Sequence, residues 1–122
     1  MVVNMAKKTI LVIDDNEMII KALRALLGEE HIEVYGAENG ALGIKEYARI
    51  KPDLVITDME MPVMSGEKVI ARIKAEYPLQ KVLAMSSRSS NEKGYTDLMV
   101  DGAPLPHQPD TIIRWLIDRL RS

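Results

Sequence analysis

The sequence predicts an α/β domain in which a five-stranded parallel sheet is covered by five helices on its two faces. Short apolar runs alternate five times with longer segments of helical periodicity. Such alternation is typical of parallel strands joined by right-handed helical crossovers. The run around Val55 and Ile56 is apolar without a break, as in a strand that is buried on both faces. With 122 residues, we expect one domain over residues 1–122, in which residues 1–7 form a ragged N-terminus.

The composition narrows the classes of function. The net charge is −2 and no basic run occurs, which disfavours direct binding to DNA or RNA. Cysteine is absent, so disulfides, thiolate nucleophiles and cysteine-bound metals are excluded. No apolar stretch has the length of a membrane span, and the N-terminal segment is too short for a signal peptide, so we expect a cytoplasmic protein with no membrane partner.

The first half of the chain predicts two strands and two helices. Ile10 to Ile13 form the first strand, and Asn16 caps a helix that ends near Gly28. The apolar face of this helix is formed by residues at helical spacing, namely Ile19, Ile20, Leu23, Leu26 and Leu27. Apolar and polar residues alternate from Ile32 to Tyr35, which predicts an edge strand.

Asn39-Gly40 marks the start of the next helix, which covers Ala41 to Ile50. Gly43 lies inside that helix and costs about 1 kcal/mol relative to alanine unless packing requires it. Pro52-Asp53 ends this segment and leads into the central strand, which stops at Asp58.

The second half predicts three more helices and two more strands. Gly66 to Tyr77 form a helix that Pro78 stops, with Val69, Ile70, Ile73 and Tyr77 facing inward. Val82 to Met85 form a strand that ends at Ser86-Ser87. A helix over residues 89–100, a short strand within residues 102–109 and a final helix over residues 110–121 complete the pattern.

Carboxylates follow two of the apolar runs. Asp14 and Asp15 come directly after the first strand, and Asp58 ends the central one. If these strands are neighbours, three carboxylates meet at one edge of the sheet, where open parallel sheets collect ligands. Two unit charges about 4 Å apart repel by roughly 4 kcal/mol at an effective dielectric of 20, so the cluster must bind protons or a cation. Oxygen ligands without histidine or cysteine favour a hard ion such as Mg²⁺. Taken alone, Asp14 and Asp15 fit a helix cap better than a metal site, and it is Asp58 with the loop after it that reverses this preference.

Together these residues resemble the receiver domain of bacterial response regulators. The resemblance rests on Asp14-Asp15, on Asp58-x-x-Met61-Pro62-x-Met64-x-Gly66 and on Ser86, and it covers nearly the whole chain. It implies a flavodoxin-like fold with the strand order 2-1-3-4-5, in which the first and third strands are neighbours.

The resemblance also implies roles for individual residues. Asp58 is the phosphoacceptor, Ser86 hydrogen-bonds the phosphoryl group, and Mg²⁺ is held by Asp15, Asp58 and the Glu60 carbonyl, with Asp14 acting through water. Phosphate comes from a histidine kinase, a phosphotransfer protein or a small phosphodonor. Output passes to a downstream protein through the face formed by the 89–100 helix, the 102–109 strand and the 110–121 helix. Homodimerisation is left open.

One position departs from the family pattern. Gln108-Pro109 stands where receiver domains usually carry Lys-Pro, so the cation that would pair with the phosphoryl group is missing. Charged hydrogen bonds contribute roughly 1.5–3 kcal/mol each. We therefore expect Mg²⁺ binding to survive while the coupling of phosphorylation to the signalling face is weakened.

We expect a receiver that is not an enzyme, apart from promoting its own phosphorylation and dephosphorylation. Three alternative functions compete with this interpretation. A nucleotide-binding domain is disfavoured because acidic residues follow the first strand in place of a glycine-rich loop. An aspartyl-phosphate phosphatase normally carries its second aspartate two positions after the nucleophile, whereas Asp14 and Asp15 are adjacent. A pseudo-receiver that binds partners without phosphorylation stays open because of Gln108.

Overall fold

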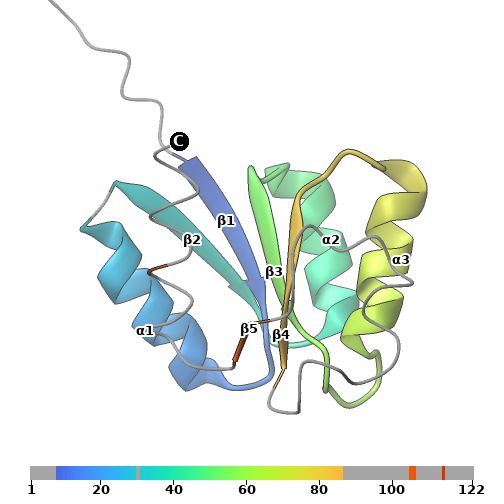
Figure 1. Cartoon of the computed structure of the whole chain (residues 1–122), viewed down its shortest axis with the longest axis horizontal. Coiled ribbons are helices and arrows are strands. Elements are labelled where there is room, and N and C mark those ends of the chain that lie inside the picture. The colour runs from blue at the N-terminus through green and yellow to red at the C-terminus, as the bar shows by residue number, and fades with distance from the viewer. Residues whose placement is uncertain (1–7, 30, 87–104, 107–113, 115–122) are drawn as a thin grey trace, which may run out of the picture.

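A computed structural model of the chain describes residues 8–29, 31–86, 105–106 and 114. They contain a five-stranded sheet in which every pair of neighbours is parallel (Figure 1). The strands are β1 (Lys8–Ile13), β2 (Ile32–Ala37), β3 (Leu54–Asp58), β4 (Val82–Ser86) and β5 (Leu105–Pro106). Their order is β2-β1-β3-β4-β5, which confirms the predicted flavodoxin-like topology and the edge position of the second strand.

Three described helices cover the sheet: α1 (Glu17–Gly28), α2 (Gly40–Ile50) and α3 (Gly66–Glu76). Each begins after a polar cap, because the side chains of Asn16, Asn39 and Ser65 accept a hydrogen bond from an otherwise unpaired main-chain N–H. The predicted helices over residues 89–100 and 110–121 lie outside the described residues. Within the described part of the chain, no helix is long and apolar enough to cross a membrane.

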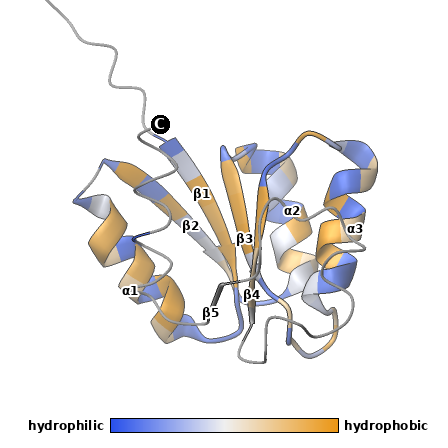
Figure 2. Ribbon diagram, viewed as in Figure 1, coloured by the Kyte–Doolittle hydropathy of each residue, from blue (hydrophilic) through white to orange (hydrophobic). Residues whose placement is uncertain are grey.

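The sheet separates two apolar cores, as Figure 1 and the colouring of Figure 2 illustrate. Ile10 and Val12 of β1 point to the core under α1, whereas Leu11 and Ile13 point to the core under α2 and α3. Successive side chains of a strand alternate between faces, so a central strand must be apolar throughout to be buried on both. All five residues of β3 are accordingly buried, including Thr57 and Asp58 at its end.

Packing explains the glycine inside α2. A Cβ atom on Gly43 would stand 2.5 Å from Cδ1 of Ile13, closer than side-chain contacts allow. Glycine therefore lets the helix approach β1, which offsets its low helix propensity.

Two residues expected in the core are less buried than predicted. Leu26 is 43% exposed because it lies at the margin of the apolar stripe of α1. Tyr77 is also 43% exposed, because it follows the last residue of α3 as its C-cap. Its ring packs against Tyr47, with ring centroids 5.2 Å apart.

The end of the sheet opposite the aspartates is tied together at Gln80. The Tyr47 hydroxyl donates to Oε1 of Gln80 at 2.8 Å, and Nε2 of Gln80 donates to the Lys81 carbonyl at 2.9 Å. Nζ of Lys74 donates to the Gln80 carbonyl at 2.5 Å. We call these contacts the Gln80 junction; it links α2 and α3 to the segment that enters β4.

We expect Tyr47→Phe to lower the free energy of unfolding by about 1 kcal/mol at neutral pH, because it removes the hydrogen bond to Gln80. Burial, and secondarily Tyr77, raises the pKa of Tyr47 above its ordinary value. The unfolded chain therefore loses this proton first, so the stabilisation is complete below pH 10 and is lost as the pH rises above it.

Urea unfolding of both proteins at pH 7 and above pH 10 measures this effect. The difference in the free energy of unfolding between wild type and Tyr47→Phe should be smaller at the higher pH. A difference that stays constant or widens would contradict the burial of a neutral phenol.

Candidate functional site

The carboxylates of Asp14, Asp15 and Asp58 meet at the carboxyl edge of the sheet. β1 and β3 are hydrogen-bonded neighbours, with Ile13 opposite Thr57. The residues that follow these two positions therefore emerge side by side. One carboxylate oxygen from each aspartate lies within 4.8 Å of the other two. Parallel pairing thus brings together residues that are more than forty positions apart in the sequence.

The three aspartates differ in exposure. Asp14 is fully buried, Asp58 is 5% exposed, and Asp15 is open to solvent. Oδ1 of Asp14 accepts a hydrogen bond from the Asn16 amide at 2.8 Å. Oδ1 of Asp58 accepts one from the Glu60 amide at 3.1 Å. Main-chain amides thus orient the two buried carboxylates and partly replace their hydration.

The main chain of Asp58 is held as closely as its side chain. The Thr57 hydroxyl donates to the Asp58 carbonyl at 3.1 Å. Gly66, the first residue of α3, packs against the same carbonyl, since a Cβ added there would stand 2.3 Å from the oxygen. The Met59 amide donates to the Met85 carbonyl of β4 at 3.0 Å. Asp58 therefore sits on a main chain fixed from three directions.

The loop between β3 and α3 makes a strained turn beside the site. Met59 and Met61 are buried and anchor it, whereas Val63 is 92% exposed. Val63 has a φ of 70°, and the Met64 amide donates to the Pro62 carbonyl at 2.7 Å across it. This is a γ-turn with positive φ, a rare conformation that is costly for a β-branched residue. The turn reverses the chain so that Ser65 can cap α3.

The donor set fits a hard divalent cation. All three side chains offer carboxylate oxygen, and no histidine belongs to the group found among the described residues. Three carboxylates this close together repel one another unless positive charge lies between them. Mg²⁺ prefers such oxygen ligands and retains several waters, which suits a site with one solvent-exposed carboxylate.

The other expected site residues are placed only in part. Ser86 is the last residue of β4, one position after Met85, which lies opposite Asp58. Its main chain is thus at the same edge of the sheet, but its side chain lies outside the described part, as does Gln108. Glu60 lies two residues beyond Asp58, half-buried, and donates its amide to that carboxylate.

Sequence reasoning missed Thr57 and Val63. A polar residue inside an otherwise apolar strand, next to the proposed nucleophile, was the available signal for Thr57. The turn at Val63 left no signal, because valine is the opposite of what a positive φ favours.

Comparison with known proteins supplies the family. The family model of the response regulator receiver domain matches residues 10–103 of this chain. The chemotaxis protein CheY of Listeria monocytogenes is 30% identical over 115 residues, which cover 88% of this chain and 93% of that protein. A protein-glutamate methylesterase/protein-glutamine glutaminase of Pseudomonas fluorescens is 36% identical over 96 residues, or 77% of this chain. The chain spans only 29% of that relative's length.

Solved structures agree with this assignment. The response regulator TrrA of Thermotoga maritima, solved in complex with Mg²⁺-BeF, has a TM-score of 0.80 and 29% identity, covering 93% of this chain and 98% of that one. A CheY-like receiver domain protein of Methanospirillum hungatei has a TM-score of 0.84 at 21% identity, covering 95% of each chain, and supports the fold alone. Since the family description covers most of the sequence and a relative of similar length matches it nearly throughout, this chain belongs to the response regulator receiver domain family of two-component signalling.

Proposed function

We propose that Asp58 accepts a phosphoryl group in a Mg²⁺-dependent reaction. One observation carries the proposal: carboxylate oxygens of Asp14, Asp15 and Asp58 lie within 4.8 Å of one another at the carboxyl edge of the sheet. Asp15, Asp58 and the Glu60 carbonyl would hold the ion directly, and Asp14 would hold it through water. When bound, Mg²⁺ neutralises the carboxylates and the charge on the transferring phosphoryl oxygens.

The residues of the chain contribute chiefly position. An Asp58 oxygen forms the new bond to phosphorus while the bond from phosphorus to the donor's imidazole nitrogen breaks, leaving its electron pair on that nitrogen. The Glu60 amide keeps the carboxylate oriented, and Thr57 and Gly66 fix the main chain beneath it. Water later hydrolyses the acyl phosphate. Ser86 is proposed to donate a hydrogen bond to the phosphoryl group.

The partners follow from the same proposal. The donor is a histidine kinase or phosphotransfer protein in the cytoplasm. The receiver occupies residues 1–122, with residues 1–7 as a ragged N-terminus. A downstream protein reads the face that β5 would form with the helices predicted over residues 89–100 and 110–121. The receiver domain catalyses only its own phosphorylation and dephosphorylation. The complete three-carboxylate cluster favours this function over a pseudo-receiver, which needs no metal site.

Incubation with Mg²⁺ and acetyl phosphate should add the mass of one phosphoryl group to the intact protein. Asp58→Asn should gain none, whereas Glu76→Gln, an exposed change on α3, should behave as wild type. Chelation of the metal should abolish the gain. Intact mass spectrometry checks all four samples, and an equal gain in Asp58→Asn would refute the assignment.

Gly66→Ala should slow phosphorylation, because its Cβ would force the Asp58 carbonyl and Met59 Cα to move. We expect stability to fall by about 1–3 kcal/mol, as for other overpacked sites. Gly28→Ala is the matched control, since no atom lies within 4 Å of a Cβ at that position. Rates from the mass assay, with stability from urea unfolding, test the pair. Wild-type kinetics in Gly66→Ala would show that this contact does not position Asp58.

Gln108→Lys should raise the equilibrium constant of the conformational change induced by beryllium fluoride about tenfold or more, because a charged hydrogen bond contributes roughly 1.5–3 kcal/mol. The affinity for Mg²⁺ should not change. NMR titration with Mg²⁺, then with beryllium fluoride, measures both. Gln108→Met controls for the loss of the amide without adding charge. If Gln108→Lys and wild type respond equally, the missing lysine does not limit coupling.

A further inference from the structure

A groove runs along the open edge of β2, and main-chain groups of this strand lie at its base. β2 is the outermost strand, and no described strand pairs with its outer side. The Ala37 carbonyl accepts from the Asp14 amide, so Ala37 faces inward. Because the main-chain groups of consecutive residues alternate between sides, those of Ile32, Val34 and Gly36 face outward. Arg24 occupies one of them, with Nε 3.3 Å from the Val34 carbonyl.

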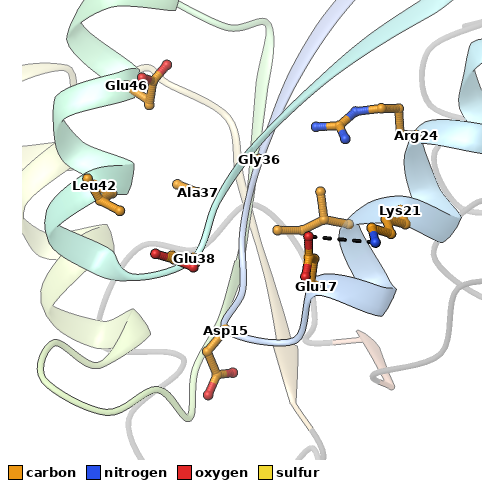
Figure 3. A pocket seen from close by; sticks show the side chains of 10 residues that line it. Asp15, Glu17, Lys21, Arg24, Gly36, Ala37, Glu38, Leu42 and Glu46 are labelled. Atoms are coloured by element: carbon orange, nitrogen blue, oxygen red, sulfur yellow. Dashed lines mark ion pairs between the residues drawn. The ribbon is translucent and has the colours of Figure 1, made fainter.

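Two hollows lie along this edge. A hollow of about 410 Å³ borders Gly36 and Ala37, and a second of about 260 Å³ borders Ile32 and Val34. Arg24 lines both, so its side chain divides one groove that follows the strand. Figure 3 shows the larger hollow, with Glu17, Lys21 and Arg24 of α1 on one wall and Leu42 and Glu46 of α2 on the other.

The larger hollow carries an excess of negative charge. Four carboxylates line it, those of Asp15, Glu17, Glu38 and Glu46, against the two cations Lys21 and Arg24. Glu17 is paired with Lys21 at 3.7 Å, Glu46 is paired with Arg49 of the same helix, and Arg24 is engaged with the strand. Among the described residues, Asp15 and Glu38 are therefore the lining carboxylates that have no ion-pair partner. Leu42 is 40% exposed and adds an apolar contact on the α2 wall.

We propose that this edge binds an extended, basic segment of a partner protein as an added β-strand. An incoming strand would supply main-chain hydrogen bonds to Gly36 and replace Arg24 at the Val34 carbonyl. Because the side chains of a strand alternate between its faces, one face would direct lysine or arginine toward Glu38 and Glu46 on the α2 side, and the other would direct apolar residues toward Ile20 on the α1 side. Asp15 lines the hollow and also belongs to the aspartate cluster, so an occupant would lie beside the proposed phosphorylation site.

The test uses the full chain without a phosphodonor and an acetylated Lys-Val-Arg-Val-Lys peptide as the probe. NMR titration should shift the amides of Gly36 and Leu42 and slow hydrogen exchange at Gly36. The same peptide with every main-chain amide N-methylated keeps its charge but cannot donate main-chain hydrogen bonds from either edge, so it should not bind. Equal binding of the methylated peptide, or shifts confined to the aspartate cluster, would overturn the proposal.

Variants locate the surface. Glu38→Lys should weaken peptide binding by about fivefold, because it turns an attractive charge that has no described ion-pair partner into a repulsive one. Arg24→Ala should strengthen binding, since it frees the Val34 carbonyl and removes a like charge. Glu76→Lys makes the same charge change on α3 and should match wild type. If Glu76→Lys weakens binding as much as Glu38→Lys, net charge alone attracts the peptide. If Gly36 is protected from exchange in a concentration-dependent way without peptide, the occupant is a second copy. Either result refutes the proposed partner.

Discussion

The parallel pairing of β1 with β3 is the constraint on which the functional end of this protein depends. It turns two distant segments into neighbours and leaves their acidic ends less than 5 Å apart. Folding alone would not favour that result, because carboxylates this close together repel one another. The apolar interior of both strands supplies the driving force, and the burial of Ile56 and Leu11 holds the carboxylates together against their repulsion. The apolar strands thus stabilise an arrangement of charges that would be unfavourable on its own.

Much of this architecture could be predicted from the sequence, because its determinants are local. Unbroken apolar runs identified the buried strands, and Asn16 and Asn39 marked helix starts through their caps. The convergence of the aspartates followed once the strand order was known. The order itself came from family resemblance, since periodicity identifies strands but not which strands are neighbours.

What the sequence did not reveal depends on contacts between segments. Leu26 and Tyr77 have the spacing of core residues, but their exposure is decided by where the helix surface curves away and where the helix ends. The tight approach of Gly66 to Asp58 follows from how α3 is set against the sheet. The left-handed turn at Val63 is imposed by its surroundings, because the preference of valine opposes it. Such features appear only when the chain is assembled.

The Gln80 junction has a practical consequence. It fastens the amino edge of the sheet, while the acidic site is assembled from loops at the carboxyl edge. Leu79 stands beside the junction and is 93% exposed, so a fluorophore or an immobilising tag at this position would rest on a rigid support far from the chemistry. Such a label would follow molecular tumbling and complex size while leaving the reactive end undisturbed, which makes the position a natural reference point for biophysical work on this receiver.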